Sequence, residues 1–132
     1  MKTIIAGGRT FNDYQLLKSK VDYYRNTHTI SEVVSGCASG ADALGEQYAI
    51  DNEIPIKHFR ANWDQYGRSA GPIRNKQMAD YADCLIAVWD GESRGTKNMI
   101  ENMNKLMKPV FIIWIGGEIV AQGAVPWNKI GN

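Results

Sequence analysis

Short apolar runs alternate with longer amphipathic segments along most of the chain. An apolar run of roughly four to eight residues that stops at glycine or a polar turn is typical of a buried strand, whereas apolar positions that recur every three or four residues are typical of a helix. The runs predict strands at 3–6, 32–35, 54–59, 84–89 and 110–115. The amphipathic segments predict helices at 13–25, 39–52, 72–82 and 95–107.

This alternation of strands and helices predicts an α/β fold. Strands that are apolar on both faces belong to a parallel sheet covered by helices on both sides. Right-handed crossovers then wind the chain into a Rossmann-like, doubly wound, mostly parallel five-stranded sheet. A loop is expected at 60–71, and a short edge hairpin or irregular tail at 116–132. The length of 132 residues is that of one domain, which we expect to cover 1–132.

Composition and charge exclude some functions without selecting one. A formal net charge of +1 gives no overall attraction to nucleic acid or to an anionic membrane, and the longest apolar run, PVFIIWI, is too short to span a bilayer. Cys37 and Cys84 match neither a metal-binding spacing nor a disulfide-rich pattern, and His28 and His58 are interpreted as surface or strand-end residues. We therefore expect a cytoplasmic protein without metal or cofactor, for which nucleic acid and membrane are disfavoured partners.

The residues that follow the predicted strands are the unusual part of the sequence. These strand ends read GGRT, SGCASGAD, SAGPIRN and DGESRGT, so each contains glycine and three contain an arginine, namely Arg9, Arg74 and Arg94. Ligands of a doubly wound sheet bind at the carboxyl ends of its strands. Glycine lets the backbone approach a phosphate, and the next helix N-terminus offers unpaired N–H groups. Arg74 is expected in the first turn of its helix, where acids are the usual choice, and this departure favours a functional role.

The strand ends therefore predict a phosphate-bearing ligand, for which the glycines make room. Its phosphate would lie over 36–40 and 95–96, with Arg74 and Arg94 as clamps. Neither G-x-G-x-x-G nor G-x-x-x-x-G-K-[ST] occurs, so the standard dinucleotide fingerprint and the P-loop are both absent. The residues predicted to bind the ligand are Gly7, Gly8, Arg9, Ser35, Gly36, Cys37, Ala38, Ser39, Gly40, Asp42, Trp63, Arg74, Asn75, Gly91, Ser93, Arg94, Gly95 and Thr96.

Several of these residues also have a plainer interpretation. Ser39 and Asp42 have the spacing of a capping box, so Asp42 serves the helix, the ligand or both. Cys37 is more typical of a small loop residue than of a nucleophile, because the sequence places no base beside it. Trp63 and Tyr66 lie in the long loop, where they either stack on a base or pack the loop onto the sheet.

The helices also carry large apolar side chains that bear on the core and on assembly. Helical spacing predicts that Met99, Met103, Leu106 and Met107 face the core. The three methionines together with Tyr14, Tyr23 and Tyr24 exceed what one small core holds. Because large exposed apolar patches mark interfaces, we expect a homodimer or a dimer of dimers, built mainly from helix 13–25 or helix 95–107. The alternative is a monomer whose tail covers the patch.

Four segments resemble a known family. AGGRTFND, VVSGCASGAD, ANWDQYGRSAGPIRNKQMADYAD and AVWDGESRGTKNMIE are similar, in order and spacing over about residues 1–115, to the YspA/YpsA-type SLOG family. The wider superfamily includes the DNA-processing protein DprA and the LOG phosphoribohydrolases, and its fold is Rossmann-like. The resemblance implies a nucleotide or nucleotide-derived ligand, which the protein would sense or sequester.

The resemblance also leaves an enzymatic alternative open. LOG enzymes split nucleoside 5′-monophosphates into base and ribose 5-phosphate, and they carry glutamates two and three positions after a Gly-Thr pair. Those positions hold Asn98 and Met99 here, with Glu101 about one turn deeper. A hydrolase would use Arg74, which matches the LOG arginine, with Glu101, whereas the missing carboxylates favour binding without turnover. DprA-like binding of single-stranded DNA is a third alternative, disfavoured by the charge balance and the short chain.

Overall fold

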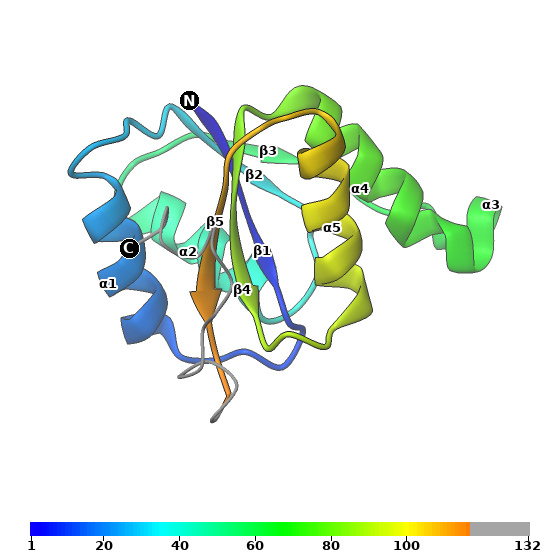
Figure 1. Ribbon diagram of the computed structural model, residues 1–132, viewed down its shortest axis with the longest axis horizontal. Coiled ribbons are helices and arrows are strands. Elements are labelled where there is room, and N and C mark those ends of the chain that lie inside the picture. Colours follow the sequence, from blue (N-terminus) through cyan, green and yellow to red (C-terminus); the bar gives the residue numbers. More distant parts are fainter. Residues whose placement is uncertain (117–132) are drawn as a thin grey trace.

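A computed structural model of the chain describes residues 1–116, which form a parallel five-stranded sheet with helices on both faces (Figure 1). The strands are β1 (Lys2–Gly7), β2 (Glu32–Ser35), β3 (Ile56–His58), β4 (Cys84–Trp89) and β5 (Val110–Trp114). Their order in the sheet is β3-β2-β1-β4-β5, and each neighbouring pair is parallel. The predicted Rossmann-like α/β fold is thus confirmed, and the predicted tail at 117–132 lies outside the described residues.

The longer helices form one layer on each face of the sheet. They are α1 (Tyr14–Tyr24), α2 (Ala41–Asp51), α3 (Trp63–Tyr66), α4 (Ala70–Tyr81) and α5 (Arg94–Lys105), with a 3₁₀ turn η1 (Gly67–Ser69) between α3 and α4. In Figure 1, α1 and α2 cover one face, while α4 and α5 cover the other. Within residues 1–116, no helix has the length and apolar character needed to cross a membrane.

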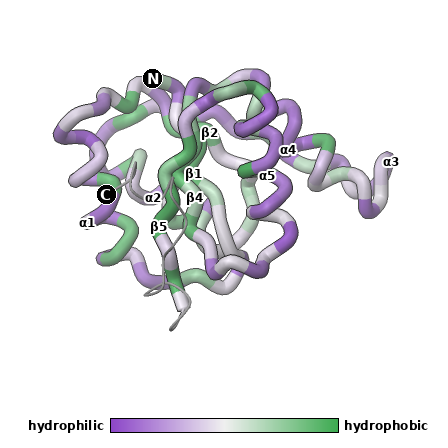
Figure 2. The backbone as a smooth tube through the Cα atoms, viewed as in Figure 1, coloured by the Kyte–Doolittle hydropathy of each residue, from purple (hydrophilic) through white to green (hydrophobic). Residues whose placement is uncertain are grey.

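Alternate residues of each strand supply the two cores. Along β1, Ile5 packs with Leu17 of α1 and Tyr48 of α2, whereas its neighbour Ile4 packs with the α4 and α5 side, including Met78. All five of these side chains are buried to within 1% exposure. Because successive strand residues point to opposite faces, a sheet covered on both sides needs continuous apolar strands, which Figure 2 shows at the centre of the molecule.

The strand order creates a crevice between the carboxyl ends of β1 and β4. In the sheet, β1 has β2 on one side and β4 on the other. The chain runs from β1 to β2 on one side and from β4 to β5 on the other. The connections therefore leave β1 and β4 in opposite directions, which opens a crevice at their carboxyl ends. The loops after β1, β2 and β4, which carry the glycines, all meet at this edge.

The segment 60–71, predicted to be a loop, is instead partly helical. The Asn62 side chain accepts a hydrogen bond from the Gln65 N–H at 3.1 Å and so caps the short helix α3. The long helix α4 then begins at Ala70, two residues earlier than predicted. Arg74 consequently lies in the second turn of α4 and not in its first, so the helix N-terminus does not oppose its charge as the sequence suggested.

The end of α5 corrects the prediction that four helical residues face the core. Met99 and Met103 are buried, but Leu106 is 42% exposed and Met107 is 92% exposed. The helix ends at Lys105, where the Met107 N–H donates to the Asn104 carbonyl and the Lys108 N–H donates to the Met103 carbonyl. This is a Schellman turn, and it places Met107 at the left-handed position with φ of +57°.

Met107→Gly should therefore stabilise the protein by about 0.5–1 kcal/mol, because glycine takes a positive φ without steric cost and this side chain has almost no packing to lose. Urea denaturation of the variant and the parent measures the difference. Met107→Ala is the matched control: it also removes the exposed side chain but keeps a Cβ in the left-handed conformation. Equal free energies of unfolding for the two variants would contradict this explanation.

Candidate functional site

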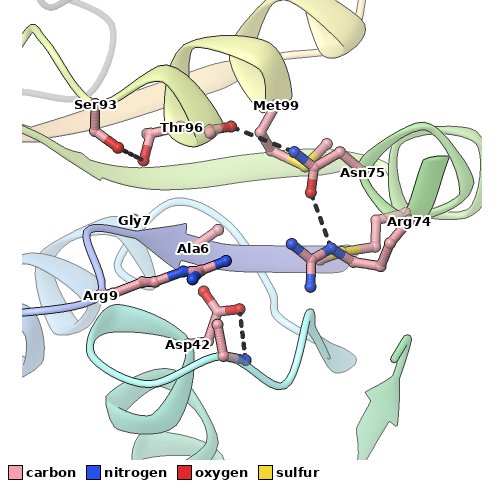
Figure 3. Close-up of a pocket in the computed structure, with 12 residues that line it drawn as sticks. Ala6, Gly7, Arg9, Asp42, Arg74, Asn75, Ser93, Thr96 and Met99 are labelled. Carbon is pink, nitrogen blue, oxygen red and sulfur yellow. Dashed lines mark hydrogen bonds between the residues drawn. The ribbon is translucent and has the colours of Figure 1, made fainter. Parts of the chain in front are cut away.

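A cavity of about 360 Å³ lies at the carboxyl ends of β1 and β4, where the sequence predicted a ligand. Figure 3 shows Arg9, Asp42 and Arg74 pointing toward one another across this space, with Thr96 and Met99 on the side of α5. We call it the switch-point cavity. Its lining residues are Ala6, Gly7, Arg9, Ala38, Asp42, Arg74, Asn75, Met78, Ser93, Gly95, Thr96 and Met99.

A second cavity of about 360 Å³ adjoins the first on the side of β2 and α3, and we call it the side cavity. The two share Arg9, Ala38 and Arg74. The Arg9 guanidinium lies over the ring of Trp63, 5.8 Å from its centroid, and this ring forms an exposed aromatic wall. The lining residues are Arg9, Gly36, Cys37, Ala38, Ser39, Arg60, Ala61, Trp63 and Arg74.

Close backbone contacts require glycine at two of the predicted positions. Gly40 has φ of +75°, and a Cβ on it would lie 2.2 Å from the carbonyl oxygen of Gly8. A Cβ on Gly7 would lie 2.3 Å from the carbonyl oxygen of Val88. Glycine at position 40 therefore lets the loop after β2 contact the loop after β1. Glycine at position 7 lets the end of β1 lie close against β4. By contrast, a Cβ on Gly95, which also lines the switch-point cavity, would meet no atom within 4 Å.

Asp42 belongs to the cavity, and the predicted capping box is wrong. Gly40 is the N-cap of α2 and has no side chain to cap with, while the Ser39 hydroxyl donates to the Arg9 carbonyl at 3.1 Å. Asp42 is 5% exposed and accepts a hydrogen bond from the Ala38 N–H at 3.2 Å. Burial raises the pKa of the Asp42 carboxyl above its ordinary value, although the Ala38 N–H and the Arg74 charge oppose the shift.

Asp42→Asn should stabilise the unliganded protein near pH 7 and have less effect near pH 3. Because the folded-state pKa of Asp42 lies above the unfolded-state value, the folded protein holds this proton more tightly. That contribution to stability is complete below the unfolded-state pKa and is lost as the pH rises through the folded-state pKa. Asparagine keeps an oxygen for the Ala38 N–H but carries no charge. Urea denaturation across this pH range measures the effect.

Asp90→Asn is the control of opposite sign. The N–H groups of Glu92 and Ser93 each donate to Asp90 at 2.8 Å and lower the pKa of its carboxyl. Its contribution to stability is therefore present above the unfolded-state pKa and is lost as the pH falls through the folded-state pKa. Asp90→Asn should destabilise the protein near pH 7. The same pH trend in both variants would contradict the interpretation of Asp42.

Arg74 is held in place by hydrogen bonds at both ends of its guanidinium. Nη1 donates to the Gly36 carbonyl at 2.6 Å, and Nε donates to Oδ1 of Asn75 at 3.0 Å. Asn75 in turn donates to the Gly95 carbonyl at 3.3 Å and to Oδ1 of Asn98 at 3.0 Å. This chain of bonds joins the loop after β2 to α4 and α5, and it keeps a half-buried arginine at the boundary of both cavities. Arg74 thus lies where the sequence predicted a clamp.

The structure brings most of the predicted site residues together, but not all. Arg94, the second expected clamp, is exposed at the start of α5 and lines neither cavity. Glu101 is likewise exposed on α5, away from both. Two further residues line neither cavity: Ser35 is fully buried, and Gly91 is exposed after β4. Gly8 lines a smaller neighbouring pocket with Asp90 and Ser93.

Sequence reasoning missed Arg60 and the part that Met78 and Met99 play in the cavity walls. Arg60 lines the side cavity, and its position two residues after β3 was the signal that could have revealed it. Cys37 also lines this cavity, and burial is the main cause that raises the pKa of its thiol. The thiol is therefore protonated near neutral pH, as expected for a loop residue and not for an activated nucleophile.

Comparison with known proteins places this chain in a family. Residues 1–66 match the family described as YspA, cpYpsA-related SLOG. The Gene 61 protein of Mycobacterium phage D29 is 30% identical over an alignment of 118 residues, and the match covers 83% of this chain and 93% of that protein.

DNA processing protein A (DprA) from Streptococcus pneumoniae has a similar structure, with a TM-score of 0.70 and 16% identity, over 98% of this chain but only 55% of DprA. At that identity the likeness to DprA concerns the fold alone. The family match spans the first two glycine-bearing strand ends, and with the identity to the phage protein it shows that this chain belongs to the YspA, cpYpsA-related SLOG family.

Proposed function

We propose that this protein binds a nucleotide or a nucleotide-derived phosphate ligand and acts as a sensor or a sequestering protein. The observation that carries the proposal is the pair of adjoining cavities at the carboxyl edge of the sheet, which share Arg9 and Arg74. A phosphate would lie between the loop after β2 and the start of α5, at Gly95 and Thr96. There the helix N-terminus offers N–H groups and the positive end of its dipole.

The charges around the two cavities support an anionic ligand. Within residues 1–116, their lining includes Arg9, Arg60 and Arg74 but only one carboxylate, that of Asp42. Opposite charge in a partly enclosed site attracts a phosphate more strongly than the net charge of +1 would suggest. Trp63 is 49% exposed beside the side cavity, so its ring offers a flat face on which a base can stack.

A binding screen tests the proposal. Thermal-shift measurements followed by calorimetry would compare mononucleotides, cyclic nucleotides and ADP-ribose species with the corresponding nucleosides and with inorganic phosphate. We expect at least one nucleotide to raise the melting temperature and its nucleoside to have little effect, because the arginines act on the phosphate. If no phosphate-bearing compound binds, or if nucleosides bind as tightly as nucleotides, the proposal is wrong.

The position of Glu101 argues against the hydrolase alternative. Cleavage of an N-glycosidic bond needs an acid or base within reach of the reacting atoms, and Glu101 is exposed outside both cavities. Incubation with AMP and chromatography for free base separates the two functions. We expect no release of base, so release that is abolished by Glu101→Gln would overturn this conclusion.

The DNA-binding alternative has its own test. Strongly salt-dependent binding of an oligonucleotide would favour it.

Self-association through α1 or α5 remains part of the proposal. Tyr24, Met99 and Met103 are buried in this chain's own core, so the apolar side chains in support of an interface are Tyr23 on α1, which is 57% exposed, and Leu106 just after α5, which is 42% exposed. Light scattering coupled to size exclusion measures the mass at micromolar concentration. We expect a homodimer or a dimer of dimers, and a mass near 14.7 kDa would contradict it.

A further inference from the structure

Three side chains with metal-binding atoms, each from a different segment of the fold, meet beside the side cavity. Cys37 follows β2, Glu46 lies on α2, and His58 ends β3. The Cys37 sulfur, one Glu46 carboxylate oxygen and one His58 ring nitrogen all lie within 4.8 Å of one another. Nε2 of His58 is 3.4 Å from Oε1 of Glu46. The neighbouring positions of β2 and β3 in the sheet, with α2 packed beside β2, create this cluster.

A buried hydroxyl orients two of the three groups. The Ser35 side chain, which is 0% exposed, donates to Oε2 of Glu46 at 2.5 Å and accepts a hydrogen bond from the Cys37 N–H at 3.1 Å. Oε1 of Glu46 is thereby left facing His58. Cys37 itself has φ of +64°, an uncommon conformation for a residue with a Cβ. Metal ligands in proteins are typically oriented by such hydrogen bonds from a second layer of residues.

The kinds of atom in the cluster indicate which metal fits. A thiolate, an imidazole and a carboxylate together suit Zn²⁺, whereas Mg²⁺ and Ca²⁺ take oxygen ligands. Ligands of a tetrahedral zinc ion lie about 3.3–3.8 Å apart, given bonds of about 2.0–2.3 Å. The Glu46–His58 separation already falls in that range. The side chains of His58 and Glu46 are 43% and 26% exposed, so small movements of these two can close the remaining gap to the sulfur.

We propose that Cys37, Glu46 and His58 form a zinc site with three protein ligands and an open fourth position toward the side cavity, where Cys37 forms part of the wall. On binding, the Cys37 thiol releases its proton to solvent and the thiolate bonds the metal. The fourth position would hold a water molecule. The site shares Cys37 with the wall of the side cavity, but its test uses no nucleotide, so metal binding and nucleotide binding can fail separately.

Cobalt titration tests the site, because Co²⁺ takes the place of Zn²⁺ and is coloured. With tag-free protein and no nucleotide, we expect saturation at one Co²⁺ per chain. A thiolate-to-cobalt charge-transfer band in the near ultraviolet and tetrahedral bands in the visible should appear, and added Zn²⁺ should remove them. Cys37→Ser should abolish the charge-transfer band. His58→Gln should weaken zinc affinity at least about 100-fold, and Ser35→Ala about 10-fold through loss of orientation.

The chain supplies its own controls, since it has two cysteines and two histidines. Cys84→Ser and His28→Gln should keep the cobalt spectrum, because Cys84 lies in the core with Thr3 and Tyr24, and His28 stacks on Tyr24. Circular dichroism confirms that each variant is folded before titration. The proposal is overturned if no charge-transfer band forms, if folded Cys37→Ser retains it, or if it is lost in folded Cys84→Ser.

Discussion

Replacing Gly40 with alanine is expected to lower the free energy of unfolding by about 3 kcal/mol or more. Gly40 combines φ of +75° with ψ of −127°, a backbone conformation that residues with a Cβ rarely adopt. The added Cβ would also lie 2.2 Å from the Gly8 oxygen and 2.5 Å from the Arg9 carbonyl carbon. Both neighbours are backbone atoms, so relief requires moving the loop after β1 away from the start of α2. Urea denaturation measures the loss.

Gly95→Ala is the matched control for this prediction. Gly95 lies in the first turn of α5, and a Cβ there would meet nothing within 4 Å. Alanine should therefore leave stability unchanged or raise it by up to about 1 kcal/mol, because it is the better helix former. If the two substitutions destabilise the protein equally, the close approach of the two loops does not explain why glycine occupies position 40.

Arg74→Ala should weaken binding of the nucleotide found in the screen by about 10- to 100-fold. Removal of a charged hydrogen-bond donor from a partly buried site costs about 1.5–3 kcal/mol, and tenfold in affinity corresponds to about 1.4 kcal/mol. Arg74 borders both cavities and is pre-oriented by Gly36 and Asn75, so little side-chain freedom is lost on binding. Calorimetry with the parent and the variant measures the change.

Arg94→Ala should change the same affinity by less than about threefold, although the sequence pattern alone predicts both arginines as clamps. Its side chain is exposed and outside the lining of both cavities, and surface charges contribute little. Arg74→Lys guards against a purely structural effect of the alanine change, because it keeps the charge but not the fork that joins Gly36 and Asn75. Equal losses for Arg74→Ala and Arg94→Ala would show that the cavities are not the binding site.

The fold and the edge of the sheet that holds the site could be read from the sequence. Continuous apolar strands such as 84–89 alternate with amphipathic helices, and this local pattern permits few arrangements other than a parallel sheet covered on both faces. The carboxyl ends of parallel strands lie at one edge, so glycine and arginine after several strands predict a shared site there. The part that the sequence determined is thus the part that depends on residues close together in the chain.

Contacts between distant segments decided the rest. The sequence could not tell that Gly40 makes room for the Gly8 carbonyl, because that contact joins two loops more than thirty residues apart. It could not separate Arg74 from Arg94, since both follow strands, and a hydrogen bond to the Gly36 carbonyl, 38 residues away in the chain, holds only the first at the cavities. Nor could it bring His58 to Cys37, which requires the pairing of β2 with β3. Local pattern fixes the backbone's course, but the chemistry of a site depends on side chains that only long-range packing brings within reach of one another.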